Sequence, residues 1–128
     1  MISNVGPLEK KILNILWIKE HATAREICTS LEKTGDRKAY STVRTIIKRL
    51  VHKRIIVQHE NPEDRQFYYS PTMTKQELER SIVYNVIGDL LIKFEQSTMN
   101  CLAEELSDNK EEVKRIKEKL AEMKKNAQ

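Results

Sequence analysis

The fold is decided by the stretch STVRTIIKRL, residues 41–50. Its apolar residues recur at the i, i+3, i+4 and i+7 spacing that marks one face of an α-helix. They are Val43, Ile46, Ile47 and Leu50. The other faces carry hydroxyl side chains first and long cations further on. The spacing therefore predicts a helix from about residue 40 to residue 53, with one buried face and one basic face.

The charge around this helix is one-sided. Residues 37–54 include seven Lys and Arg and no Asp or Glu. Residues 1–72 hold 13 basic and 8 acidic residues, whereas residues 73–128 hold 10 and 11. A block of one sign is typical of a surface that binds a polyanion. Taken alone, it is equally consistent with a solvated helix face.

Two shorter helices are predicted before the basic one. Pro7 can open the first, because the first position of a helix does not need its N–H group. The second opens with Thr23 and Glu26, whose spacing is that of a capping box, and it ends before Gly35. Only a few residues around His21 separate the two helices.

After residue 53 the apolar period changes from 3.6 to 2. Residues 55–57 and 66–69 read as strands, and Pro71 ends the second. The NPED sequence at 61–64 has the chemistry of a turn. Three helices and a hairpin, in this order, predict a mostly α fold with a small β-wing: a winged helix-turn-helix over residues 1–72.

Residues 73–128 are expected to form a helical dimerisation domain. Thr74 and Glu77 repeat the capping-box pattern before a long helix; a short helix then spans Met99 to Leu106, and Asp108 is expected to cap the last one. The apolar stripes are too wide for a single arm to bury, so a second copy is predicted to cover them. The alternative is that the arm packs back onto the N-terminal module. The predicted dimerisation residues are Ile82, Val86, Leu90, Phe94, Val113, Ile116 and Leu120.

A winged helix-turn-helix places its recognition helix in the major groove of DNA. Short polar groups and Arg at the start of that helix suit base edges or adjacent phosphates, whereas later cations suit phosphates. Double-stranded DNA is therefore the predicted partner, and a dimer would read a palindrome. The predicted DNA-binding residues are Ser41, Thr42, Arg44, Thr45, Lys48 and Arg49 on the helix, and Arg65 in the wing.

Other classes of function find little support. The three glycines are isolated, so no phosphate loop is present, and the three histidines share no ligand spacing. Cys28 lies on an apolar helical stripe and is expected to be a core residue. No enzyme activity, metal or cofactor is predicted. Neither a membrane-spanning run nor a signal pattern is seen, so cytoplasmic residence is the default expectation.

Four motifs together resemble the penicillinase repressor family. They are LNILW at 13–17, TAREI at 23–27, STVRTIIKRL at 41–50 and FYYSP at 67–71. The resemblance extends over almost the whole chain. It implies a winged-helix homodimer that represses genes by covering a palindromic operator.

The resemblance also implies a switch. In the antibiotic-responsive branch, a membrane-bound sensor detects a β-lactam, and the repressor is cut in its dimerisation arm at an Asn-Phe bond. The corresponding residues here are Asn100 and Cys101, so the Phe is replaced. The paired Cys-x-Cys motifs of the copper-responsive branch are absent. Two alternatives remain open: a winged-helix protein-interaction module, and a thiol-responsive regulator that acts through Cys101.

Overall fold

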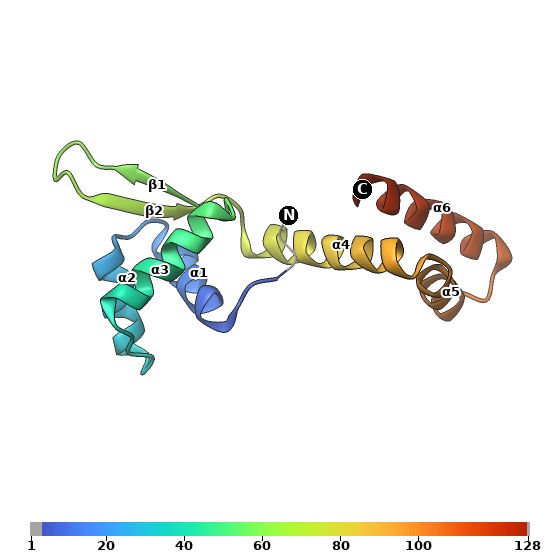
Figure 1. Ribbon diagram of the computed structural model, residues 1–128, viewed down its shortest axis with the longest axis horizontal. Coiled ribbons are helices and arrows are strands. Elements are labelled where there is room, and N and C mark those ends of the chain that lie inside the picture. Colours follow the sequence, from blue (N-terminus) through green and yellow to red (C-terminus); the bar gives the residue numbers. More distant parts are fainter. Residues whose placement is uncertain (1–3, 128) are drawn as a thin grey trace. The chain divides into compact units, whose positions relative to one another are not determined.

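The computed structural model describes residues 4–127, in which the chain forms six helices and a two-stranded sheet (Figure 1). The elements are α1 (Pro7–Lys19), α2 (Ala24–Lys33), α3 (Tyr40–His52), β1 (Ile56–Glu60), β2 (Phe67–Pro71), α4 (Lys75–Lys93), α5 (Glu95–Leu106) and α6 (Lys110–Ala127). This order confirms the predicted mostly α fold with a β-wing. The chain divides into two compact units, and each is described by itself below.

The two compact units divide inside α4, between Glu79 and Arg80; a functional division after residue 72 stays a prediction. One hydrogen bond joins the segment before α4 to α1, and the first turn of α4 contains a buried residue. The indole Nε1–H of Trp17 donates a hydrogen bond to the backbone oxygen of Met73 (2.9 Å), and Leu78 is buried. Residues 1–3 and 128, at the outer ends of the two predicted domains, lie outside the described residues.

The three helices of the N-terminal unit begin and end close to their predicted positions. At the start of α2, Thr23 Oγ1 accepts from the Glu26 N–H (3.2 Å), and Glu26 Oε1 accepts from the Thr23 N–H (3.1 Å). This confirms the capping box. At its end, Gly35 adopts φ +83°, and the Asp36 N–H bonds to the Leu31 carbonyl (2.9 Å). A left-handed residue followed by this bond is a Schellman motif, for which glycine is the least strained choice.

The core of this unit is aliphatic, as the low aromatic content of 5% requires. All four apolar residues of the α3 stripe are buried, which confirms the face predicted from their spacing. Each fully buried Leu or Ile contributes about 1.5–3 kcal/mol relative to an exposed one. The largest fully buried side chains are Ile12, Leu13, Leu16, Ile27, Leu31, Val43, Ile47, Leu50, Ile55 and Ile56.

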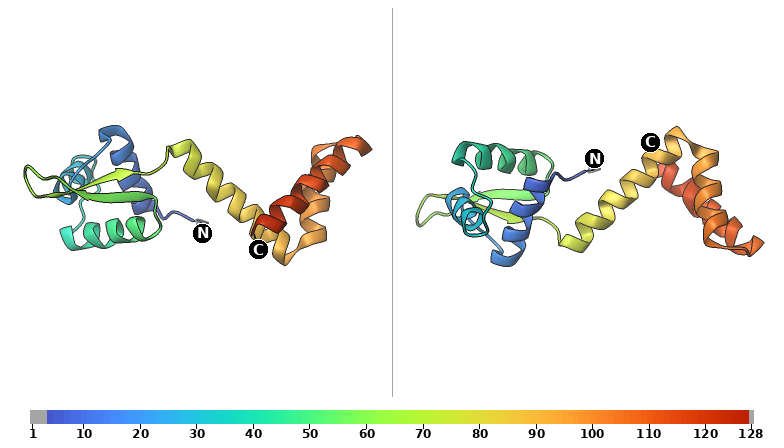
Figure 2. Two further views of the ribbon diagram at one scale, coloured as in Figure 1. Left: turned by 90° about the horizontal axis from the view of Figure 1, so that it is seen from above. Right: turned by 90° about the horizontal axis from the view of Figure 1, so that it is seen from below.

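Strands β1 and β2 form an antiparallel hairpin in which Ile56 pairs with Pro71 and Glu60 with Phe67. Its tip projects beyond the three helices (Figures 1 and 2). The segment between α1 and α2 adds a bridge that the sequence did not predict: Ala22 exchanges two backbone hydrogen bonds with Tyr69 (3.1 and 2.9 Å). The wing is thereby tied to the helix-turn-helix by its backbone.

The C-terminal unit contains most of α4 together with α5 and α6. Its core consists of Leu91, Met99 and Leu120, with partly buried Ile87, Leu102, Ile116 and Met123 packed around them. Asn109 caps α6, since its side-chain oxygen accepts from the N–H groups of Glu111 (2.8 Å) and Glu112 (3.3 Å). The predicted Asp108 cap is therefore wrong by one residue. A Cβ on Gly88 would lie 2.8 Å from Ala127 Cβ, so the close approach of α6 excludes a larger residue there.

One set of apolar side chains, on α4 and at the residue directly after it, stays outside this core. Val83, Val86, Leu90 and Phe94 are 57%, 42%, 42% and 61% exposed. Scattered exposed apolar residues are normal, whereas several on one helix indicate a surface that contacts another molecule. Among residues 4–127, no helix combines the length and the apolar character needed to cross a bilayer.

Candidate nucleic-acid interface

The exposed face of α3 carries all six of the predicted helix contacts. Because the apolar stripe holds the opposite face against the core, these side chains point to solvent together. The Thr45 hydroxyl donates to the Ser41 carbonyl within the helix (3.0 Å). The exposed residues are Ser41, Thr42, Arg44, Thr45, Lys48 and Arg49.

Tyr40, the first residue of α3, organises two cations beside this face. The guanidinium carbon of Arg25 lies 4.8 Å from the centre of the Tyr40 ring, and that of Arg44 lies 5.9 Å from it. Both distances allow an attraction between the cation and the electron-rich ring face. The side chains of α2 and α3 thus meet at one aromatic ring that the sequence analysis did not single out.

The turn of the wing is fixed by its own hydrogen bonds. Asn61 Oδ1 accepts from the Glu63 N–H (2.9 Å), and the Arg65 N–H bonds to the Asn61 carbonyl (2.8 Å). Arg65 itself adopts φ +60°. Asp64 accepts from the Gln66 N–H (3.0 Å) and from the Tyr68 hydroxyl.

Those last two bonds have electrostatic consequences. The hydrogen bond from the Gln66 backbone, and then that from Tyr68, lower the pKa of Asp64 below its ordinary value. The bond to Asp64 raises the pKa of Tyr68 in turn. The carboxylate of Asp64 is therefore engaged within the turn, and Arg65, its neighbour in sequence, forms no salt bridge with any residue of the described range 4–127.

Three arginines line one small cavity beside the wing. Arg25 comes from α2, Arg44 from α3 and Arg65 from the turn of the hairpin. The cavity has a volume of about 180 Å³, and Tyr69 forms part of its wall. Of these arginines, Arg25 is the one whose side chain was not predicted to contact DNA. Its position in the first turn of α2 indicates a phosphate contact, because helix starts can bind phosphate through their backbone N–H groups.

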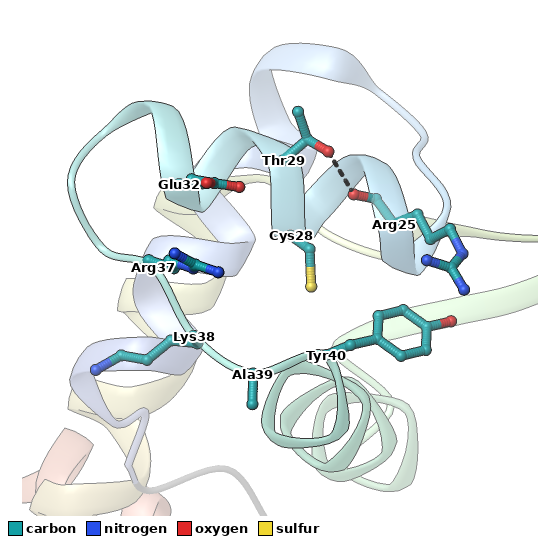
Figure 3. A pocket seen from close by; sticks show the side chains of 8 residues that line it. All are labelled: Arg25, Cys28, Thr29, Glu32, Arg37, Lys38, Ala39 and Tyr40. Carbon is teal, nitrogen blue, oxygen red and sulfur yellow. Dashed lines mark hydrogen bonds between the residues drawn. The ribbon is translucent and has the colours of Figure 1, made fainter.

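A larger surface pocket of about 620 Å³ adjoins this cavity and shares Arg25 and Tyr40 with it (Figure 3). Arg37 and Lys38, from the segment before α3, line its other side. The Cys28 thiol also lines it and is only partly buried, so the prediction of a plain core residue is wrong. Burial raises the pKa of this thiol, which keeps it in the less reactive protonated form.

The predicted arm residues fall into two groups. Val86 and Leu90 are exposed on α4, Phe94 is exposed directly after it, and Ile82 is half-buried. In contrast, Leu120 lies in the core of the C-terminal unit; Ile116 packs against that core, and Val113 is half-buried. The α5–α6 hairpin covers part of the arm's apolar faces, and the exposed side chains on α4 stay uncovered; that a second copy covers them stays a prediction.

The residues of the possible cleavage site, Asn100 and Cys101, both lie on α5 and are exposed. Within residues 4–127, no three His, Cys, Asp or Glu side chains are grouped closely enough to hold a metal ion.

Comparison with known proteins agrees with this geometry. Residues 5–122 match the family described as penicillinase repressor. The transcriptional regulator BlaI of Mycobacterium tuberculosis, from two strains, is 29% identical over 88 residues, which cover 68% of this chain. The matched part spans 62% of that relative's length.

A solved structure shows the same fold. The solution structure of the DNA-binding domain of the repressor BlaI matches 60% of this chain and 90% of its own, with a TM-score of 0.51 and 23% identity. The family groups repressors rather than enzymes, which confirms the expectation of a protein without catalytic activity. The chain belongs to the penicillinase repressor family.

Proposed function

We propose that this chain is a transcriptional repressor that binds a palindromic DNA operator as a homodimer and acts in the cytoplasm. One observation carries the proposal: the solvent face of α3 presents three cations and three hydroxyls, in a segment that contains no acid. Such a face suits the major groove, where cations neutralise phosphates and short polar groups reach base edges. The family membership supports the same reading.

The positions along α3 suggest a division of labour. Ser41, Thr42 and Thr45 lie in its first two turns and are assigned to base edges. Lys48 and Arg49 lie further along and are assigned to phosphates, which position the helix without specifying sequence. Arg44, between the two groups, is within reach of base edges or adjacent phosphates.

Pairing of two copies would use the exposed side of α4. Val83, Val86, Leu90 and Phe94 are left uncovered by the protomer's own core, and a second copy of the same face would cover them in an isologous interface. Leu120 is not proposed as an interface residue, because it is buried in the core of its own chain. A dimer of this kind presents two copies of α3 to two half-sites, about one helical turn of DNA apart or a multiple of it.

Relief of repression is assigned to proteolysis in the arm, in response to a β-lactam or another cell-envelope signal detected by a membrane-bound sensor. The support is the position of Asn100 and Cys101, which are exposed in the middle of α5. A helical backbone must open locally before a protease can bind it. The test is to expose cells to a β-lactam and to measure the mass of the recovered protein by mass spectrometry. A fragment ending at Asn100 is expected. Derepression with the chain intact would contradict the assignment.

Selection from random duplexes with the full-length protein tests DNA recognition itself. A palindromic consensus is expected to emerge. Lys48→Ala or Arg49→Ala should weaken binding to all sequences and reduce the slope of log affinity against log salt by about one. Lys119→Ala, an exposed cation on α6, is the matched control and should leave the slope unchanged. Recovery of no preferred sequence would refute operator recognition.

A further inference from the structure

The cavity beside the wing brings together three positive charges from separate elements. Arg25, Arg44 and Arg65 line it, and the nearest two in sequence are 19 residues apart. Its other walls come from hydroxyl, aromatic, amide and small side chains, and no carboxylate lines it. Like charges held close together repel one another, so an arrangement of this kind is stable when an anion occupies it.

The acids that could have neutralised these arginines are engaged elsewhere. Glu26, next to Arg25, accepts from the Thr23 N–H in the capping box of α2. Asp64, next to Arg65, accepts from the Gln66 N–H and from a tyrosine hydroxyl. Within residues 4–127 none of the three arginines belongs to a salt bridge. Arg25 and Arg44 instead approach the Tyr40 ring, at 4.8 and 5.9 Å from its centre.

The size of the cavity restricts the anion. At about 180 Å³, it is smaller than the roughly 300–1,000 Å³ of pockets for drug-sized ligands. Guanidinium groups bind phosphate oxygens in a bidentate manner, and a phosphate presents oxygens to several donors at once. The dimensions and the donors therefore suit a single phosphate group.

We propose that Arg25, Arg44 and Arg65 together bind one phosphate of the DNA backbone. These three residues are called the arginine site below. The site rests on the proposed function and extends it: two helices and the wing hold the same phosphate, which sets how α3 lies in the groove. Arg44 is thereby assigned to the backbone, and discrimination between bases falls to the hydroxyl residues of α3. The bridge between Ala22 and Tyr69 ties the wing, which carries Arg65, to the helix-turn-helix, which carries the other two arginines.

Neutralising single phosphates tests the arginine site. The duplex selected by the full-length protein is prepared with one uncharged methylphosphonate at each backbone position in turn, and affinities are measured for wild type and for Arg25→Gln, Arg44→Gln and Arg65→Gln. One position per half-site is expected to weaken wild-type binding by about tenfold, as for a lost charged contact. At that position the three variants should lose little further affinity, because the partner is already gone.

Two controls define the result. The affinity loss of Arg49→Gln should disappear on a duplex whose methylphosphonate lies at a different position. Arg115→Gln changes an exposed arginine of α6 and should bind every duplex as wild type does. Thermal unfolding of each variant confirms that it is folded. If the effects of the three arginine variants disappear at three different methylphosphonate positions, or at none, the arginine site is refuted while operator recognition stands. If no duplex is ever selected, the proposed function fails, and the arginine site fails with it.

A free anion is the alternative source of the same chemistry. Inorganic phosphate is titrated into the DNA-free protein at constant ionic strength, with the arginine Nε–H signals followed by NMR. Weak, unsaturated shifts are expected, because a lone ion lacks the neighbouring contacts of a DNA strand. Saturable binding at low millimolar phosphate that is lost in Arg65→Gln, together with methylphosphonate effects that do not involve the arginines, would assign the cavity to a small anion and overturn the proposal.

Discussion

Adjacent leucines on α4 provide a sharp test of pairing. Leu90 is 42% exposed, whereas Leu91 is fully buried in the core with Met99 and Leu120. If a second copy covers the exposed face, Leu90→Asp should break the dimer and leave the protomer folded. Leu91→Ala should do the opposite: it removes core packing, which costs about 2–5 kcal/mol of unfolding free energy.

The size of the Leu90→Asp effect follows from its exposure. Full burial of a leucine is worth about 1.5–3 kcal/mol, so covering the exposed two-fifths contributes roughly 0.6–1.2 kcal/mol per protomer. An isologous interface counts this contribution twice, and each new carboxylate adds a desolvation penalty of about several kcal/mol. The dimer should therefore weaken by at least about 3 kcal/mol, which is on the order of a hundredfold in Kd or more.

Sedimentation equilibrium measures the Kd, and circular dichroism with urea denaturation reports the fold. Leu90→Asp should sediment as a monomer at concentrations where wild type is a dimer, and its operator affinity should fall with the loss of the second half-site. A Leu90→Asp protein that remains dimeric with the wild-type Kd would refute the assignment of this face. A wild-type chain that is monomeric at tens of micromolar would do so as well.

Three further changes test the N-terminal unit. Thr23→Ala removes the hydroxyl acceptor of the α2 cap and should lower the free energy of unfolding by about 0.5–2 kcal/mol in urea denaturation. Lys53→Met leaves the buried carboxylate of Glu9 without its cation, which lies 3.0 Å away in wild type. The free energy of unfolding should fall by about 1–3 kcal/mol, because Lys53 is partly exposed, and adding Glu9→Gln should restore most of this loss. Asp64→Asn should lower the pKa of Tyr68 towards 10.0 in an ultraviolet titration, because the phenol no longer donates to a carboxylate. In wild type this hydrogen bond stabilises the wing below that pH. Its contribution is lost as the pH rises through the raised pKa of Tyr68.

Local chemistry made most of the fold predictable. The capping boxes at Thr23 and Thr74 both form, because each requires only residues three apart in the chain. The buried stripe of α3 was predictable for the same reason, since helical spacing alone fixes which side chains share a face. The Asp108 cap was a miss of this local kind: the adjacent Asn109 offers an equally suitable acceptor, and the path of the chain from α5 decides between them.

Other features depend on which elements meet. Cys28 fits the apolar pattern of α2, yet the segment before α3 leaves a pocket beside it rather than covering it. The hydrogen bond from the Trp17 indole to Met73 joins residues 56 positions apart in sequence, and no local pattern predicts it.

The sequence by itself determined the order of the elements, the basic face of α3 and the family to which the chain belongs. These follow from periodicity, charge and motif, which are properties of neighbouring residues. Only the tertiary structure decided that Arg25, Arg44 and Arg65 share one cavity, and that Leu91 is buried while Leu90 is exposed. The physical reason is that convergence and burial depend on how the helices and the wing pack against one another. Contacts between residues tens of positions apart produce no periodic pattern in the sequence.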